Sequence, residues 1–415
     1  MTVSPPAGPR WATLATHRLW LLEQANILLG LFERHSIDPS GGFFALDRAG
    51  HPRPQAEASG RGLHSTTRMV HCFSIAHLMG RPGAAALIDH GMDYLWRGHR
   101  DPDHGGYYWS MGVDGALDTT KQAYGHAFVL LAASSAKVAG HPDADRLLTD
   151  ISTLLADKFW EDQHGAAAEQ FTRDWQTYDT YRGQNANMHL TEALMAAFEA
   201  TGDSQYLRMA ERIADLIVRR RAAENGWRLP EHFDAQWAVD REYNGDQTFR
   251  PYGTTPGHWL EWSRLLLQLW ELGGRTLDWL PEAARALFRN AVTEGWDAAR
   301  GGFYYTLDWS GRPHIANRYF WPCTEAIGAA SFLNAIDGGA FNEHWYRRIW
   351  DFSARYFIDR EHGGWFPRLG EDLQPLHELN LGKPDLYHAL QACLIPLLPT
   401  SGSITAGLRG QGIHL

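Results

Sequence analysis

A histidine and a glutamate three residues apart, His258 and Glu261, are well suited to acid–base chemistry. On a helix, this spacing places both side chains on one face. A carboxylate beside an imidazole fixes the tautomer of the ring and raises its basicity. The preceding TTPG is typical of a turn into a helix N-terminus, with Pro256 in the first turn. The pair is therefore either an acid–base group at a helix start or an ordinary helical pair without chemistry.

Similar polar residues interrupt the apolar pattern near the starts of other helical segments. A buried polar side chain costs free energy unless it is paired, so chance explains such a repeated placement poorly. For any single residue, a hydrogen-bonded position in the core remains the alternative. The six groups are His64 and Arg68; Gln122, Tyr124 and His126; Asn185, Asn187, His189 and Glu192; His258 and Glu261; Arg318, Tyr319, Trp321 and Glu325; Lys383, Asp385 and His388.

Histidines, an arginine and carboxylates together favour removal of a proton from a carbon next to a carbonyl. Histidine supplies a base whose pKa is near neutrality. Arg68 can stabilise the negative charge that develops on the enediolate. Glycoside hydrolysis is the second interpretation, and it needs two carboxylic acids that flank the bond. Its candidates are outnumbered by histidines, so we rank it lower; they are Glu192, Glu261, Glu325 and Asp385.

Metal and nucleotide motifs are missing from the sequence. It contains no H-E-x-x-H, no paired E-x-x-H on a second helix and no acidic cluster suited to magnesium or manganese. It also has no P-loop, and no G-x-G-x-x-G between a strand and a helix. We therefore predict a site without a metal and without a cofactor.

A Gly-Gly-aromatic signature recurs along the chain, clearly at 41–44, 105–108, 301–304 and 363–366 and more weakly near 165 and 226. Each copy predicts a turn followed by a short strand, and most carry a second turn that completes a hairpin. Two stretches of helical periodicity separate successive copies. The predicted helices cover 11–34, 64–79, 83–97, 119–139, 144–159, 184–201, 205–221, 256–272, 280–295, 319–335, 341–357 and 384–398.

Six helical hairpins can form either an open solenoid or a closed (α/α)6 barrel. The odd-numbered helices are amphipathic, whereas the even-numbered ones are more apolar and richer in small residues. This difference favours an outer ring that faces water and an inner ring buried on both sides. We predict an all-α, (α/α)6 barrel with short β-hairpins at one end. It would form a single domain over 11–398, with a flexible N-terminus at 1–10 and a flexible tail at 399–415.

The composition excludes several partners. The formal net charge is −10 without a long run of either sign, which argues against nucleic acid or an anionic membrane as a partner. No apolar stretch is long enough to span a membrane, and the first residues lack a signal core. The three cysteines are far apart, which is typical of a reduced compartment. We expect a cytoplasmic monomer or homodimer that acts on a neutral or weakly anionic small molecule, such as a monosaccharide.

Four motifs together resemble the N-acylglucosamine 2-epimerase superfamily over roughly 11–398. They are STTRM at 65–69, NANMHLTEA at 185–193, PGHWLEW at 256–262 and KPDLYHA at 383–389. The resemblance implies an (α/α)6 barrel. It also implies that His388 takes the proton from C2 of the sugar and that His258 is a second acid or base. Glu261 would orient His258 or pass protons between sugar oxygens.

Further roles also follow from the resemblance. His189 and Arg68 would bind hydroxyls and steady the enediolate. The expected substrate-binding residues are Asn185, Tyr124, Trp321, Asp385 and Glu325.

Within the superfamily, FRPYGTTPGHWLEW and GKPDLYHALQA look most like the isomerases that convert D-mannose to D-fructose. D-Lyxose and D-xylulose would be a secondary pair. The alternatives are a 2-epimerase of mannose and glucose or of cellobiose, and a sulfoquinovose isomerase. An (α/α)6 glycoside hydrolase, a non-catalytic sugar-binding barrel and a helical-repeat scaffold are further classes that we rank lower.

Overall fold

The protein is described by a computed structural model that covers residues 8–53, 60–376, 382–400 and 402–413. All twelve predicted helices are present, which confirms the repeat count. The helices are α1 (Ala15–His35), α2 (Leu63–Leu78), α3 (Ala84–Tyr94), α4 (Ala123–Val138), α5 (Ala144–Leu154), α6 (Gln184–Thr201), α7 (Ser204–Ala214), α8 (Pro256–Leu272), α9 (Trp279–Asn290), α10 (Phe320–Asp337), α11 (Ala340–Tyr356) and α12 (Leu386–Leu394). Four outer helices continue into π-helical turns at Leu95–His99, Leu155–Phe159, Asp215–Ala222 and Ala291–Gly295.

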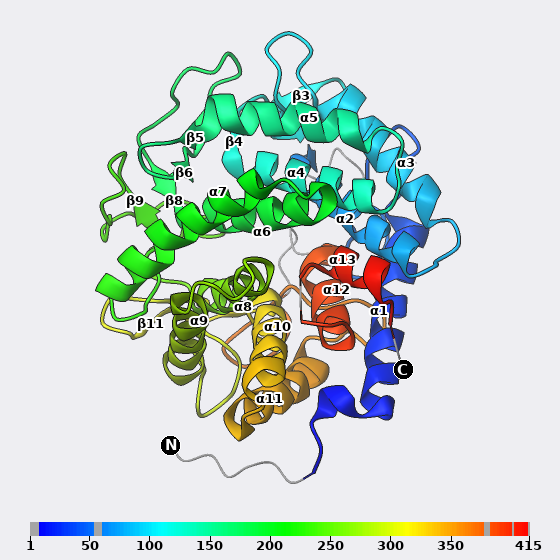
Figure 1. Ribbon diagram of the computed structural model, residues 1–415. Helices are drawn as coiled ribbons and strands as arrows, with labels where there is room; N and C mark the ends of the chain where they lie inside the picture. Colours follow the sequence, from blue (N-terminus) through cyan, green and yellow to red (C-terminus); the bar gives the residue numbers. More distant parts are fainter. Residues whose placement is uncertain (1–7, 54–59, 377–381, 401, 414–415) are drawn as a thin grey trace.

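The helices form two concentric rings, as Figure 1 shows. The even-numbered helices α2, α4, α6, α8, α10 and α12 form the inner ring, and α12 packs against α2 to close it. Each inner helix also packs on one odd-numbered outer helix. Helix α4 is buried along almost its whole length, because its small and apolar residues contact neighbours on every side. The predicted (α/α)6 barrel is therefore confirmed, and the open solenoid is excluded.

Short strands connect the helices at one end of the barrel. They pair as a three-stranded sheet β1-β2-β3 and as the hairpins or pairs β4-β7, β5-β6, β8-β9, β10-β11 and β12-β13, all antiparallel. Their bounds are β1 (Arg61–Gly62), β2 (Ser110–Met111), β3 (Ala116–Asp118), β4 (Lys121–Gln122), β5 (Trp160–Glu161), β6 (Ala166–Ala167), β7 (Gln170–Phe171), β8 (Arg182–Gly183), β9 (His232–Phe233), β10 (Thr306–Leu307), β11 (Pro313–Ile315), β12 (Arg318–Tyr319) and β13 (Arg368–Leu369).

The repeated Gly-Gly pair meets a backbone requirement of the turn. Gly301 and Gly302 have φ values of +90° and +79°, in the left-handed region that favours glycine. A Cβ atom on Gly302 would lie 2.7 Å from Cγ of Arg318. The glycine pair is thus a structural element of the four repeats that carry it.

Five acid–base pairs, which we call the rim pairs, each connect the turn of one repeat to the start of the next inner helix. The acid precedes the glycine turn, and the base lies just before the helix. The rim pairs are Asp38–Arg61, Asp101–Lys121, Glu161–Arg182, Asp297–Arg318 and Asp359–Lys383. In the fourth repeat, the corresponding positions hold two buried uncharged residues, Ala222 and Thr254.

Both ends of the chain were predicted to be flexible, and the structure describes most of the C-terminal stretch but little of the N-terminal one. The stretch predicted as a flexible tail contains a short helix, α13 (Ile404–Gly410), which packs against α2 and α4. Ile404 and Leu408 of α13 are buried because they cover the end of the inner ring opposite the strands. The predicted flexible N-terminus lies largely outside the described residues, which begin at 8.

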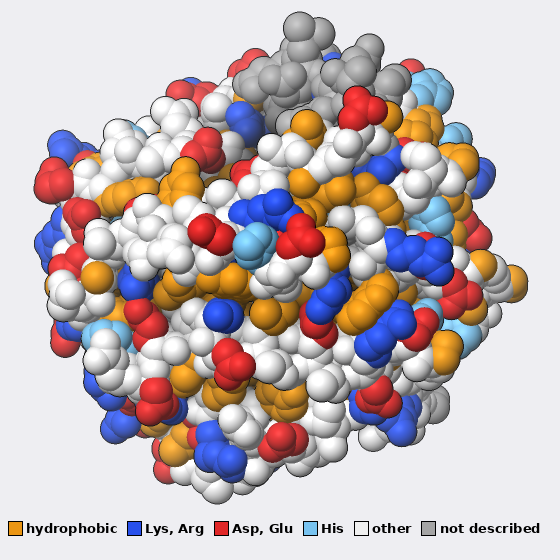
Figure 2. Space-filling view, turned by 90° about the horizontal axis from the view of Figure 1, so that it is seen from above, with side chains coloured by type: hydrophobic (Ala, Val, Ile, Leu, Met, Phe, Trp, Pro, Cys, Tyr) orange, Lys and Arg blue, Asp and Glu red, His pale blue; other side chains and the backbone are white. Residues whose placement is uncertain are grey.

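The outer surface mixes both signs of charge. On the face seen in Figure 2, acidic and basic side chains alternate over short distances without a broad patch of either sign. Among the helices of the described segments, none combines the length and the apolar composition needed to cross a bilayer.

Candidate active site

A cavity of about 220 Å³ opens where the inner helices begin. Every inner helix, or the residue just before it, contributes to its wall, as the repeated polar positions predicted. Residues of the loop after β9 and the residue just before β10 complete the wall. The lining residues are Arg68, Tyr124, Asn185, His189, Thr248, Phe249, His258, Glu261, Tyr305, Tyr319, Phe320, Trp321, Pro384, Asp385 and His388.

His258 is held by a carboxylate that the sequence prediction missed. Its Nδ1 lies 2.8 Å from Oε2 of Glu231, which precedes β9, so Nδ1–H donates to this carboxylate and Nε2 is left as the acceptor. Gln184 binds the same Glu231 oxygen at 2.7 Å, and Trp262 in turn binds Gln184 at 2.8 Å. The expectation that Glu261 orients His258 is therefore replaced, because Glu231 occupies that nitrogen.

His388 is held in the same manner from another side of the barrel. Its Nδ1 lies 2.7 Å from Oε1 of Glu325, and the second oxygen of Glu325 lies 3.0 Å from Nη2 of Arg264. Burial by itself would raise the pKa of Glu325, but Arg264 and the bond from His388 outweigh burial and lower it. Glu325 was expected to bind substrate. It lies behind His388 instead, outside the cavity lining, because both of its oxygens are already engaged.

The ring of Trp321 lies close to both imidazoles. Its ring centroid lies 5.0 Å from that of His258 and 5.9 Å from that of His388, with an interplanar angle of 34° in both cases. Both histidines line the same cavity, on helices α8 and α12. One small substrate can therefore contact both rings.

Arg68 supplies the positive charge of the cavity wall. Its Nη1 lies 2.9 Å from Oδ2 of Asp385, and its Nη2 donates to the hydroxyl of Tyr124 at 2.9 Å. The guanidinium also lies over the rings of Phe128 and Tyr387, at 4.4 and 4.7 Å. Burial and the surrounding charges raise the pKa of Tyr124 to about 12, so its hydroxyl stays protonated near neutrality. These contacts fix the position of the Arg68 guanidinium in the cavity wall.

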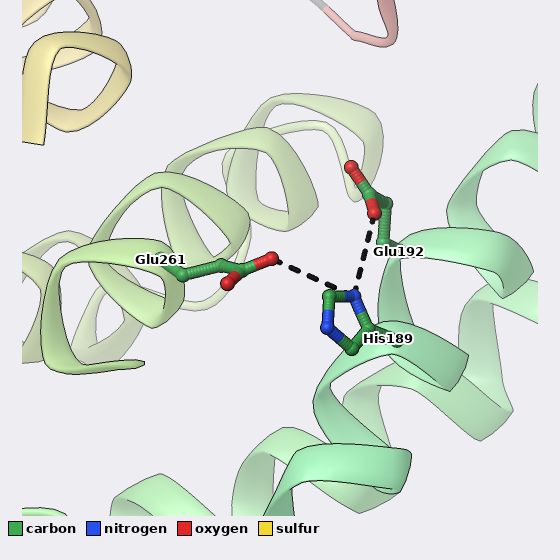
Figure 3. Close-up of side chains that lie close together, drawn as sticks. All are labelled: His189, Glu192 and Glu261. Carbon is green, nitrogen blue, oxygen red and sulfur yellow. Dashed lines mark ion pairs between the residues drawn. The ribbon is translucent and has the colours of Figure 1, made fainter. Parts of the chain in front are cut away.

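His189 and Glu261 form the floor of the cavity, and Glu192 lies beneath them. Figure 3 shows these three side chains close together. Nδ1 of His189 lies 3.6 Å from Oε1 of Glu261 and 3.9 Å from Oε2 of Glu192. Burial lowers the pKa of His189 to about 3, so this ring is neutral. Burial, with repulsion from Glu325, raises the pKa of Glu261 well above its ordinary range. The floor thus holds a neutral imidazole beside a carboxyl group whose ionisation is disfavoured.

Two groups of residues place possible metal-ligating atoms within 4.8 Å of one another, His189–Glu192–Glu261 and Glu261–Glu325–His388. The guanidinium of Arg264 already contacts these carboxylates, at 3.3 Å for Glu192 and 3.0 Å for Glu325. A divalent cation would have to enter beside this fixed positive charge, which opposes its binding. We therefore interpret both groups as parts of one ion-pair network.

Other predicted polar positions serve the fold. His126 accepts a hydrogen bond from the backbone of Tyr107, and Asn187 bonds the backbone of Ala167. Arg318 and Lys383 belong to the rim pairs, and Glu192 lies beneath the floor. His64 stacks on Trp109 beside the cavity, with ring centroids 5.1 Å apart. Asn185 does line the cavity, and its buried Oδ1 has no hydrogen-bond partner among the described residues.

Several lining residues were not predicted from the sequence. Thr248 and Phe249 come from the long loop between β9 and α8, and Tyr305 lies just before β10. Glu231 had no detectable pattern, because it belongs to no helical repeat and no motif surrounds it. Its one distinguishing feature is its position just before a short strand, in the repeat that carries His258.

A proton-transfer enzyme needs two groups that can exchange protons with one substrate. Here two imidazoles each present a free nitrogen to one cavity. The fold and the cavity together define an acid–base enzyme on an (α/α)6 barrel. The chain belongs to the N-acylglucosamine 2-epimerase (GlcNAc 2-epimerase) family, whose sequence model matches residues 41–392. The resemblance found in the four motifs is confirmed.

Proteins of known activity resemble the chain over nearly its whole length. A D-mannose isomerase of Thermobifida fusca is 43% identical over 97% of this chain and 99% of the relative. A D-mannose isomerase of Pseudomonas cannabina pv. alisalensis is 42% identical over 96% and 97%. The crystal structure of a D-mannose isomerase superposes with a TM-score of 0.85 at 32% identity, covering 94% of this chain and 99% of that one.

Proposed function

We propose that this protein is an aldose–ketose isomerase that interconverts D-mannose and D-fructose by proton transfer, without a metal, through a cis-enediol. The observation that carries the proposal is the shared cavity of His258 and His388, each held at Nδ1 by a buried carboxylate. The 42–43% identity to D-mannose isomerases supports the choice of sugar. D-Lyxose and D-xylulose form a secondary pair.

His388 acts as the base at carbon. Its Nδ1–H is committed to Glu325, so its Nε2 carries the lone pair that takes the proton from C2 of the open-chain aldose. The C2–H electrons form the C1–C2 double bond, and O1 gains a proton. When the ketose forms, O2 loses its proton and C1 receives the proton from His388. The net change moves hydrogen from C2 to C1 and from O2 to O1, without an oxidant.

Other groups of the cavity stabilise the enediolate and move the oxygen-bound protons. Arg68 donates to the negative oxygen from a fixed position, since Asp385 and Tyr124 hold its guanidinium. Protonated Glu261 gives a proton to O1 and takes one from O2. His258, with Nε2 free, opens the sugar ring by accepting the anomeric hydroxyl proton and passing it to the ring oxygen as the bond from C1 to that oxygen breaks.

A 2-epimerase is the second candidate, and the presence of two imidazoles favours it. His258 could return the proton to the opposite face of C2 after rotation of the intermediate. Cellobiose 2-epimerases are among the weaker relatives, at 25% identity over 84% of the chain in the case of Bacteroides fragilis. The compartment we propose is the cytoplasm, where the three buried free cysteines would stay reduced.

The test is a product assay in heavy water with D-mannose, D-glucose, D-fructose, D-lyxose and cellobiose. We expect fructose as the first product from mannose, and deuterium at the carbon that receives the solvent-exchanged proton. Glucose as the first product would establish the epimerase instead. His388→Gln should abolish both turnover and exchange at C2. His99→Gln is the matched control, because His99 is also buried but bonds Thr66 and the backbone of Tyr108, outside the cavity.

A further inference from the structure

Arg264 is a buried arginine on α8 that touches the active site without lining it. Its guanidinium faces three glutamates of three inner helices. Nη1 lies 3.3 Å from Oε1 of Glu192, and Nη2 lies 3.0 Å from Oε2 of Glu325 and 3.7 Å from Oε1 of Glu261. One positive charge cannot balance three buried carboxylates, so at least one of them must keep its proton.

The hydrogen bonds identify the acid that stays protonated. Glu325 accepts from Nε of Arg264 at 3.1 Å and from His388 at 2.7 Å. Glu192 accepts from the same guanidinium and from a tyrosine hydroxyl of α12. Among the described residues, no hydrogen bond reaches Oε1 of Glu261. Two of the three acids therefore have the donors that an ionised carboxylate needs, and Glu261 lacks them.

The charges around the cluster agree with this distribution. Burial raises the pKa of Glu261, and neighbouring Glu325 adds to the effect. Burial also opposes ionisation of Glu192, but Arg264 and His189 outweigh it and lower the pKa of Glu192. The titratable and charged groups that face the cluster come from six segments: Arg68, His71 and Cys72 of α2, Tyr124 of α4, His189 and Glu192 of α6, Glu261 of α8, Glu325 of α10, and Asp385, Tyr387 and His388 at the start of α12.

The neighbouring inner helix leaves room for this arginine. A Cβ atom on Gly328 of α10 would lie 3.0 Å from Cδ of Arg264 and 3.2 Å from Ile395. A contact this short forces a shift of the arginine stem. Glycine at position 328 therefore leaves the arginine stem room to reach the three acids.

We propose that Arg264 is a positioning residue that sets the charge of the cavity floor, pinning ionised Glu325 against His388 and leaving Glu261 as the proton-bearing acid. This inference rests on the proposed function, because it assigns the charge state of the groups that move the protons. It adds a residue outside the cavity lining to the reaction.

The test is the pH dependence of kcat/KM, whose acid limb reports protonation of the essential base in the free enzyme. Removing a positive charge makes the cluster easier to protonate, so Arg264→Met should move the acid limb to higher pH by about one pH unit. Glu192→Gln removes a negative charge and should move the limb to lower pH. Arg264→Lys keeps the charge and should leave the limb in place, with a lower kcat.

Arg318→Met is the matched control, because Arg318 is equally buried and ion-paired but belongs to a rim pair. It should lower stability without moving the acid limb. Gly328→Ala is a milder variant that displaces Arg264 and keeps its charge, and it should lower kcat with little change in KM. Opposite shifts in Arg264→Met and Glu192→Gln support the inference. Shifts in the same direction, or none, overturn it.

A second readout separates this inference from the proposed function. The imidazole of His388, assigned with His388→Gln, can be titrated by NMR in protein without sugar. Its midpoint should rise in Arg264→Met and fall in Glu192→Gln, whichever sugar the enzyme converts. If wild-type protein isomerises no sugar while these shifts occur, the proposed function fails and the role of Arg264 stands. Normal isomerisation with unchanged midpoints would overturn the role of Arg264 alone.

Discussion

Replacing Glu231 by glutamine should change which nitrogen of His258 carries the proton. In the native site, Nδ1–H donates to Oε2 of Glu231 over 2.8 Å, and Nε2 faces the cavity as an acceptor. A glutamine amide in the same place can donate to Nδ1, and the proton then moves to Nε2. The ring would keep its position and lose its function as a base.

The size of the effect follows from that bond. A hydrogen bond to a charged group contributes about 1.5–3 kcal/mol, and each 1.36 kcal/mol is a factor of ten in rate. We therefore expect Glu231→Gln to lower kcat/KM for mannose by about 10- to 150-fold. Most of the loss should be in kcat, because the tautomer affects proton transfer more than sugar binding.

The assay is fructose formation from mannose over a range of substrate concentrations, with circular dichroism to verify folding. Glu343→Gln is the control, since Glu343 is a buried, hydrogen-bonded carboxylate of the outer helix α11, remote from the cavity. It should leave kcat/KM unchanged. A Glu231→Gln enzyme whose kcat/KM stays within about twofold of wild type would refute the role given to this carboxylate.

Two further predictions concern stability. Gly302→Ala should lower the free energy of unfolding, measured by urea denaturation, by about 1–3 kcal/mol, because the new Cβ would lie 2.7 Å from Arg318. Gly274 also has a positive φ but lies in open space, so Gly274→Ala should lower the free energy of unfolding less. Equal losses in the two variants would contradict this prediction. Stability should also fall as the pH drops from 6.5 toward 4, because burial keeps several histidines neutral in the folded chain while the unfolded chain protonates them. A melting temperature that stays constant over that range would be inconsistent with the lowered pKa values, about 4, 4 and 3, of His71, His99 and His126.

The helical barrel could be predicted because its information is local and repeated. Each helix has its own periodicity, and each glycine pair marks a turn that requires positive φ. Helix α13 was missed because its Gly-rich and Ser-rich surroundings resemble a disordered end. It is stabilised by burial of Ile404 and Leu408 against the barrel, which no local pattern records.

The candidate site was predictable only where it uses the repeat. His258, His388 and Arg68 recur at equivalent helix starts, so their convergence followed from closure of the ring. Glu231 could not be found in this way, because it comes from a loop and reaches His258 only in three dimensions. Glu325 was identified, but its orientation toward His388 depends on Arg264, whose contacts the sequence does not show.

The missing rim pair has a consequence for how this enzyme can diversify. In five repeats a rim pair connects the turn to the next inner helix, whereas the fourth repeat has Ala222 and Thr254 at these positions and no such ion pair. The segment 234–253 in that repeat carries Thr248 and Phe249 to the mouth. Insertions or deletions there would change the cavity entrance without breaking a rim pair, so this stretch is where evolution can alter sugar preference at the lowest cost to the barrel.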